Sequence, residues 1–404
     1  MTPFASLAYP FLPADEGAAA AVVEAPGDWS FDAAALPPDA DAVVWGRPAD
    51  GSSALVRRAA AREATLAGLG RRIPARLTIA AVHRLPPREL GTGARPRLRA
   101  ALRAGVLVEI VSRTGARRVL DAVAAAAGAP VLGGRLHVGA GGTVLVPARL
   151  ADGSQAVLRV ARAGAPGDPA RLGDTLETLA GAGVPLAPRL LAHGVDARAS
   201  WIAEQGLPGR RPARVTSSLV QQVVDACGRF PRSGDPPTAP IDDLRGAARR
   251  LPDRAAALTR LSSELAPVLR DLPSVLRHGD LWTGNLLVER EHLVGVIDWD
   301  AMHPRGVPGS DLVQLMGTDA RRRARQHLGE AFLRRPWRSI AFRRATAAYW
   351  PAAGTAAVPA LLDAAGIAWW ASEVHHTLVR LPHRAADERW IATNVDAVLS
   401  ALLG

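Results

Sequence analysis

The amino-acid sequence predicts an α+β protein in three parts: a small α/β domain over residues 1–127, a strand-rich domain over 128–206 and a mostly helical domain over 207–404. Three observations support this prediction. The chain of 404 residues is too long for one ordinary domain, so two to three globular units are expected. Hydrophobic residues make up 48% and charged residues 22%, a composition that excludes wholesale disorder. Short β-like runs alternate with helical stretches at first, and helical periodicity dominates after residue 210.

The first 127 residues predict a small α/β domain that contains no recognisable catalytic constellation. Residues 1–40 are rich in Ala, Pro and Asp and predict an irregular lead-in. Apolar and periodic runs predict strands at 42–45, 77–82 and 106–111 and helices at 53–69, 94–104 and 116–127. The domain could dock on the next one, shape access to a substrate or mediate oligomerisation; an activity of its own is the minor alternative. The sequence leaves its role and the oligomeric state open.

The second and third domains differ in their pattern of strands and helices. A glycine cluster at 133–142 opens the second domain. Its predicted elements are strands at 144–150 and 156–160 joined by a hairpin-type turn, a helix near 168–180 and a strand at 200–203. The third domain is helical except over residues 275–300, where turn residues alternate with β-like runs at 286–288 and 293–297.

Composition narrows the location and the partners of the protein. The single cysteine, Cys227, excludes an internal disulfide and a cysteine-based zinc site, which fits a reducing cytoplasm. We expect no secretory signal, because the N-terminal residues lack a basic region followed by an apolar core. We expect no membrane span, because acids such as Asp121 and Asp363 interrupt the apolar runs. All 49 basic residues are arginine and the net charge is +11, which favours anionic ligands. Nucleic acid is not a predicted partner, because the arginine cluster at 321–325 has no interleaved aromatic residues.

Three oxygen-bearing side chains in the third quarter of the chain carry the predicted chemistry. Asp280 lies in the segment His278-Gly279-Asp280-Leu281, Asn285 follows five residues later, and Asp298 ends the β-like run Val296-Ile297. Phosphoryl transfer requires a group that orients the attacking hydroxyl and ligands that hold Mg²⁺ against the phosphate oxygens. Carboxylate and amide oxygens suit both tasks. The spacing from Asp280 to Asn285 is also that of the protein-kinase catalytic loop.

Together these segments resemble the aminoglycoside phosphotransferase and choline kinase-like family, which has a protein-kinase-like fold. The resemblance covers about residues 130–404 and does not reach the first 125. It implies that Asp280 is the catalytic base, that Asn285 and Asp298 bind magnesium, and that His278 braces the loop. Asp311 matches the aspartate that follows the metal-binding segment and is expected to brace it. ATP and Mg²⁺ are the implied cofactors.

The resemblance also assigns nucleotide-binding residues to the second domain. Gly139, Gly141, Gly142 and Thr143 stand where a phosphate-covering loop belongs, although an ordinary β-turn is an alternative. The family usually carries a lysine where this chain has Arg159, which keeps the charge with a bulkier, planar group.

Acidic residues complete the predicted nucleotide site. Either Glu177 or Asp174 is expected to pair with Arg159 from the helix at 168–180, and Glu177 is preferred because it is longer. Glu204 and Gly206 fall where backbone groups of a kinase-like fold contact adenine.

The sequence thus predicts an ATP- and Mg²⁺-dependent kinase that phosphorylates a hydroxyl of a small molecule. Only twelve residues separate Asp298 from Asp311, too few for the activation segment of a protein kinase. Residues 301–404 hold 13 arginines and 8 acids, a balance that disfavours a polycationic acceptor. A sugar-like compound, a polyol or an amino alcohol is expected. Because Arg159 replaces lysine, the alternative is a catalytically weak module that binds nucleotide or a partner.

Five tryptophans near the C-terminus fit either a helical core or stacking on a sugar, namely Trp337, Trp350, Trp369, Trp370 and Trp390. The core is the better interpretation for any single one of them. His375 and His376 are adjacent, so they point to different sides of a helix and make a poor metal pair. We assign these histidines no chemistry from the sequence.

Overall fold

The computed structural model describes the chain in segments. These are residues 119–127, 131–134, 137–138, 143–150, 153–164, 169–195 and 199–404, and four strands nearer the N-terminus. The chain divides into two compact units. The first comprises Met1–Glu177 and Pro188–Leu207, and the second comprises Thr178–Ala187 and Pro208–Gly404. No helix among the described residues combines the length and apolar character that a membrane crossing requires.

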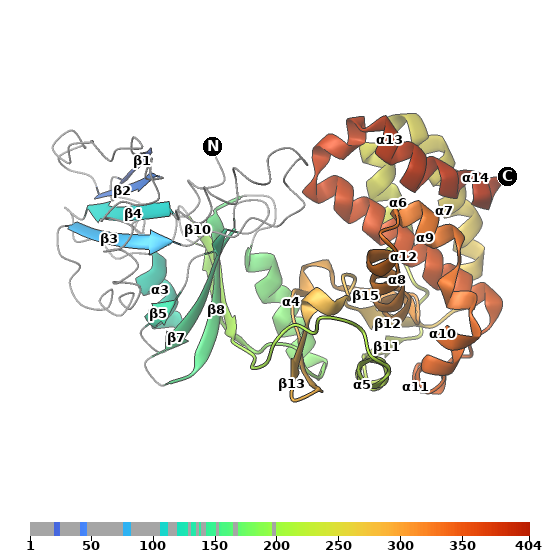
Figure 1. Cartoon of the computed structure of the whole chain (residues 1–404), viewed down its shortest axis with the longest axis horizontal. Helices are drawn as coiled ribbons and strands as arrows, with labels where there is room; N and C mark the ends of the chain where they lie inside the picture. The colour runs from blue at the N-terminus through green and yellow to red at the C-terminus, as the bar shows by residue number, and fades with distance from the viewer. Residues whose placement is uncertain are drawn as a thin grey trace. The chain divides into compact units, whose positions relative to one another are not determined.

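The N-terminal strands form one mixed sheet in the order β1-β2-β4-β3 (Figure 1). The strands are β1 Ala20–Glu24, β2 Asp41–Gly46, β3 Arg76–Ala81 and β4 Val106–Val111. The strands predicted at 42–45, 77–82 and 106–111 are confirmed. The prediction of an irregular lead-in over 1–40 is wrong at β1, because this short run pairs in parallel with β2. The pairing could not be predicted from the local sequence, since β2 lies well beyond the neighbouring residues. The helices predicted at 53–69 and 94–104 lie outside the described residues.

A second sheet of the first unit is six-stranded and its pairings are antiparallel. Its order is β5-β7-β8-β10-β9, and β6 pairs with β7. The strands are β5 Val131–Gly134, β6 His137–Val138, β7 Val144–Leu150, β8 Gln155–Arg162, β9 Leu190–Val195 and β10 Ala199–Gln205. Along β8, the alternate residues Ala156, Leu158 and Val160 are buried, as the period of a strand requires.

Two helices accompany this sheet. Helix α3, Val119–Ala126, lies against β9 and β10, and α4, Pro169–Gly181, follows β8 in the chain (Figure 1). Leu172, Leu176 and Leu179 of α4 are buried, which confirms the predicted helical stripe. The predicted hairpin of β7 and β8 is also confirmed, whereas β5, β6 and β9 were not predicted. Gly133 and Gly134 have poor strand propensity, yet they lie in β5 because β7 pairs with it.

The second unit is mostly helical, as predicted (Figure 1). Its α-helices are α5 Ser217–Cys227, α6 Ala239–Arg250, α7 Ala255–Arg270, α8 Ser310–Ala324, α9 Leu328–Leu333, α10 Ile340–Ala345, α11 Tyr349–Ala352, α12 Pro359–Arg380, α13 Glu388–Ile391 and α14 Ala397–Leu403. Short 3₁₀ turns are η6 Pro252–Arg254, η7 Thr283–Asn285, η8 Trp299–Ala301, η9 Pro336–Arg338 and η10 Pro382–Ala386, and η11 Ala392–Asp396 is a π-helical turn. The predicted α+β class, an antiparallel sheet followed by a helical part, is confirmed.

Two small sheets in the second unit carry the predicted catalytic segment. Strands β11 Arg232–Ser233, β12 Ser274–Arg277 and β15 His303–Gly306 form one sheet, and β13 Leu286–Glu289 and β14 His292–Val296 form a hairpin. The predicted β-like runs at 286–288 and 293–297 are therefore confirmed as β13 and β14.

The central helix of the second unit is α12, which packs against α6, α7, α8 and α9. The two tryptophans of α12, Trp369 and Trp370, are fully buried, as is Trp337. Trp350 is also buried, and Trp390 is half-buried. Four of the five C-terminal tryptophans therefore form the helical core rather than an open stacking surface.

Candidate active site

The candidate catalytic loop begins where the buried strand β12 ends. Each residue of β12 is buried, and the strand pairs with β11 on one side and β15 on the other. Gly279, two residues later, has φ +81°. A Cβ at this position would lie 2.1 Å from the carbonyl oxygen of Ala301. Both the backbone conformation and the close approach therefore require glycine in this turn.

Asp311, in the first turn of α8, fixes the start of this loop. Its Oδ2 accepts a hydrogen bond from the backbone N–H of His278 at 2.7 Å, and its Oδ1 accepts one from Gly279 at 3.0 Å. Asp311 is 7% exposed. Two backbone donors that would otherwise be buried without a partner are thus satisfied by one charged group. This geometry agrees with the bracing role expected for Asp311.

His278 is a fully buried residue that connects the loop to the segment after β14. The backbone N–H of Asp280 donates to His278 Nδ1 at 3.2 Å, and His278 Nε2 lies 3.0 Å from the carbonyl oxygen of Ile297. Because a backbone N–H can only donate, Nδ1 accepts, so Nε2 carries the proton and donates to Ile297. The imidazole also packs on Trp299, with 4.5 Å between ring centroids. His278 therefore holds two parts of the site together and faces no open space itself.

Asp280 and Asn285 are joined directly. Asn285 Nδ2 donates to the backbone carbonyl of Asp280 at 2.8 Å and to Asp280 Oδ2 at 3.3 Å. Both residues are buried, Asp280 to 8% and Asn285 to 4% exposure. Because the amide nitrogen is directed at Asp280, the amide oxygen of Asn285 points away from it and presents an acceptor elsewhere in the site.

Asp298 enters the same site through the β13–β14 hairpin. The backbone N–H of Ile297 donates to the carbonyl oxygen of Asn285 at 2.9 Å, which sets Asp298 next to Asn285 along the chain path. Asp298 is half-buried and has the left-handed backbone conformation φ 68°, ψ 58°. Non-glycine residues adopt it rarely, and such positions concentrate at functional sites. The structure thus brings together Asp280, Asn285 and Asp298, the three residues predicted from the sequence.

Arg380, the last residue of α12, is a member of this site that the sequence did not predict. Its Nη2 donates to Asp280 Oδ2 at 3.3 Å. Burial lowers the pKa of Arg380, but the neighbouring carboxylates of Asp280 and Asp298 raise it overall, so the guanidinium stays charged. Arg380 lies a hundred residues from Asp280, and only its four-residue spacing from His376 on one helix face was visible in the sequence.

A buried ionic network lies behind the loop. Arg277, immediately before His278, donates from Nη2 to Asp243 Oδ2 at 2.6 Å, and His375 Nδ1 lies 3.1 Å from Asp243 Oδ1. Burial would raise the pKa of Asp243, yet Arg277 and His375 outweigh it and hold this pKa well below its usual range. Burial lowers the pKa of His376 to about 4, against the opposing pull of Asp243. The two adjacent histidines thus belong to the network that supports the loop.

The predicted nucleotide-binding residues lie in the first unit. Arg159 Nε donates to Glu204 Oε1 at 3.1 Å, from β8 to the neighbouring strand β10. Glu177, the preferred partner of Arg159 in the sequence analysis, has its ion pair with His193 Nε2 at 3.3 Å instead. Asp174 lies near this Glu177–His193 pair on the exposed side of α4. The pairing of Glu204 with Arg159 was not predicted, since the sequence predicted adenine contacts for Glu204 and strand register is not readable from one sequence.

The backbone at the end of β10 is largely engaged within its own unit. The N–H of Gln205 donates to Arg189 at 2.8 Å, and the N–H of Gly206 donates to Gln155 at 2.8 Å. Thr143 is half-buried immediately before β7. The three predicted loop glycines, Gly139, Gly141 and Gly142, lie outside the described residues.

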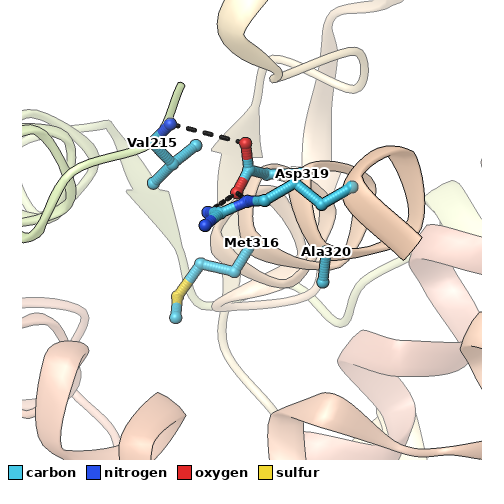
Figure 2. A pocket seen from close by; sticks show the side chains of 5 residues that line it. Val215, Met316, Asp319 and Ala320 are labelled. Carbon is cyan, nitrogen blue, oxygen red and sulfur yellow. Dashed lines mark hydrogen bonds and ion pairs between the residues drawn. The ribbon is translucent and has the colours of Figure 1, made fainter. Parts of the chain in front are cut away.

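A pocket of about 350 Å³ in the second unit lies on α8 (Figure 2). Val215, Met316 and Ala320 contribute its apolar lining. Its acid, Asp319, accepts from Arg323 Nε at 2.7 Å and from the backbone N–H of Val215 at 3.4 Å. Because this carboxylate is already paired, the pocket offers no free base or metal-ligand set, and we assign it no chemistry.

Comparison with known proteins supplies the family. The sequence profile of the phosphotransferase enzyme family matches residues 140–349, slightly more than half of the chain. The chain belongs to the phosphotransferase enzyme family. This family match covers Asp280, Asn285 and Asp298, and the predicted resemblance is confirmed. A comparison with curated protein sequences gave no significant match.

Several solved phosphotransferase structures are similar to this member of the family. A macrolide 2'-phosphotransferase from Brachybacterium faecium is 20% identical, with a TM-score of 0.47 over 68% of this chain and 97% of its own. A type VIII aminoglycoside-3'-phosphotransferase is 20% identical, with a TM-score of 0.39 over 58% and 92%. A thermostable aminoglycoside phosphotransferase mutant in complex with ADP and hygromycin B is 16% identical, with a TM-score of 0.45 over 68% and 95%. At these identities the similarity concerns the fold alone.

Proposed function

We propose that this phosphotransferase uses ATP and Mg²⁺ to phosphorylate a hydroxyl group of a small molecule. The observation that carries the proposal is the pair of hydrogen bonds from Asn285 to Asp280, next to the segment that bears Asp298. A base and two hard oxygen ligands in one place are the side chains that phosphoryl transfer needs.

In this reaction Asp280 orients the acceptor hydroxyl and takes its proton. The hydroxyl oxygen forms a bond to the γ-phosphorus while the bond from that phosphorus to the β–γ bridging oxygen breaks. The products are a phosphate monoester and ADP, and the proton passes through Asp280 to solvent. Because the transition state is loose, the contribution of the protein is mainly to position the reactants.

Asn285 and Asp298 are the residues that would hold Mg²⁺. They fit the ion, because an amide oxygen directed away from Asp280 and a carboxylate are both hard oxygen donors. The fixed backbone around them also suits a metal site, since Ile297 ties the two segments together at 2.9 Å. When bound, the ion would neutralise charge on the phosphate oxygens.

In this proposal the first unit binds the nucleotide. We also keep the predicted division of the chain into domains of residues 1–127, 128–206 and 207–404. Arg159 would contact the α- and β-phosphates, with Glu204 fixing its guanidinium. Because the N–H groups of Gln205 and Gly206 are engaged, an amide donor to adenine would come from Leu207. The loop of Gly139, Gly141, Gly142 and Thr143 would cover the phosphates. We also propose a cytoplasmic location, where ATP is available as the phosphate donor.

The preferred acceptor class rests on the excess of arginine in the C-terminal part of the chain. The proposed base Asp280 is already paired with Arg380, and residues 301–404 hold 13 arginines against 8 acids, which disfavours a polycationic acceptor. A neutral or anionic sugar-like compound or polyol is therefore preferred over an amino alcohol or an aminoglycoside.

An acceptor screen tests the proposal. Purified protein is incubated with ATP and Mg²⁺ and with sugars, polyols and amino alcohols, and ADP formation is measured together with the phosphate monoester by ³¹P NMR. The Asp298→Asn variant is the control for metal dependence, and it is expected to require more Mg²⁺ for the same rate. Saturable binding of ATP without ester formation across the whole panel would contradict the proposal and favour the catalytically weak binding module.

A further inference from the structure

One polar face of helix α12 follows the catalytic loop. Ser372, His376 and Arg380 are spaced four residues apart, so they share one face of the helix. Ser372 Oγ donates to the carbonyl oxygen of Gly279 at 3.3 Å, and Arg380 Nη2 donates to Asp280 Oδ2 at the same distance. The residues of α12 before Ser372 are largely apolar and buried, whereas most positions from Ser372 to Arg380 are polar, and two of these polar residues bond to the loop.

The two oxygens of Asp280 have different surroundings. Oδ2 accepts from Asn285 Nδ2 and from Arg380 Nη2, each at 3.3 Å. Within the part of the chain that the structure describes, no donor reaches Oδ1. The carboxylate is thus held through one oxygen, and the other is left to accept a hydrogen bond from a ligand.

Arg380 combines a fixed tip with exposure to solvent. Its side chain is 49% exposed, whereas that of Asp280 is 12% exposed. A single hydrogen bond to Asp280 uses one of the five N–H donors of the guanidinium. Because the guanidinium is about half in solvent, its single bond of 3.3 Å to the buried carboxylate contributes little to stability. The placement is better explained by an effect on the carboxylate itself.

We propose that Arg380 is a positioning residue that holds Asp280 through Oδ2 and so presents Oδ1 to the acceptor hydroxyl. This inference rests on the proposed function of Asp280 as the base. In a loose transition state the hydroxyl proton leaves late, so the orientation of the base matters more than its strength. Arginine suits this task because its guanidinium is planar and always charged, so Nη2 can be directed at one oxygen, Oδ2, more rigidly than the flexible ammonium of lysine.

The test compares Arg380→Ala and Arg380→Lys with wild type. Arg343→Ala, which removes an exposed arginine of α10 far from the loop in sequence, is the control for loss of one positive charge. We expect Arg380→Ala to lower kcat about 100-fold, as misplacement of a reacting group does, while KM for ATP changes by less than about twofold. Arg380→Lys should retain an intermediate kcat, and Arg343→Ala should match wild type.

Chemical rescue separates positioning from a structural brace. Added guanidinium ion is expected to restore kcat of Arg380→Ala and to leave Arg343→Ala unchanged, because the free ion can occupy the vacated place on Oδ2. A loss of kcat that guanidinium does not restore, accompanied by a lower Tm, would show a brace and overturn the proposal. Full activity of Arg380→Ala beside an active wild type would overturn this proposal alone. A wild type that phosphorylates no acceptor would overturn the proposed function, and this proposal with it.

Discussion

Substitution of Asp311 by asparagine tests how the loop is held. The carboxylate accepts two backbone hydrogen bonds, from His278 at 2.7 Å and from Gly279 at 3.0 Å, in a setting that is 7% exposed. Asparagine has the same shape but only one acceptor oxygen, so one N–H would face an NH₂ group. A buried bond to a charged group contributes about 1.5–3 kcal/mol, and an unsatisfied buried N–H costs about 1–3 kcal/mol. We therefore expect Asp311→Asn to lower the free energy of unfolding by about 3 kcal/mol.

Urea unfolding followed by tryptophan fluorescence measures this change, because the chain has 10 tryptophans and several are buried in the second unit. Asp253→Asn is the matched control, since its side chain is 82% exposed and its contact with Arg254 is long, at 3.7 Å. That control should change stability by less than about 0.5 kcal/mol. The kcat of Asp311→Asn should also fall, since the loop carries Asp280. An Asp311→Asn protein as stable as the control variant would show that Asp311 does not fix the loop.

Three further predictions concern the second unit. Gly279→Ala should cost about 2 kcal/mol or more, because φ is +81° and the added Cβ meets the carbonyl oxygen of Ala301. Gly183→Ala, at φ +65° with open space around the Cβ, should cost only the conformational contribution of about 1–2 kcal/mol; equal losses of Tm would contradict this. The pKa of His376 is about 4 in the folded protein and 6.5 in the unfolded chain. The free energy of unfolding should therefore decrease as the pH falls from 6.5 towards 4, by at most about 3 kcal/mol. The variant His376→Gln should weaken this pH dependence, whereas His383→Gln, at an exposed position, should leave it unchanged. Burial, with help from Asp311, raises the pKa of the Cys227 thiol, so a thiol reagent should label the native protein only at the rate of unfolding; rapid labelling of native protein would argue against this burial.

Local sequence patterns were sufficient to predict those strands and helices that depend on residues close together in the chain. The hairpin of β7 and β8, the hairpin of β13 and β14 and the buried stripe of α4 follow from alternation, turn residues and helical periodicity. The spacing of Asp280, Asn285 and Asp298 likewise predicted a shared site, because one short hairpin separates the last two.

The remaining features depend on partners that are distant in sequence. β1 and β9 form because other strands offer them free edges, which no local window records. Glu204 pairs with Arg159 through strand register, and Arg380 reaches Asp280 only because α12 packs beside the loop. The polar run that begins at Ser372 in α12, which puts Ser372, His376 and Arg380 on one helix face, was the signal in the sequence that could have indicated this contact.

Single-turnover transfer from ATP by Asp280→Asn tests whether Asp280 is the base. The substitution keeps the size of the side chain and removes its ability to take a proton. We expect the rate of phosphate transfer to the acceptor to fall by about 10²–10⁴-fold, the usual contribution of a general base, while ATP still binds. A transfer rate that stays within about tenfold of wild type would contradict the assignment of Asp280, and with it the proposed reaction.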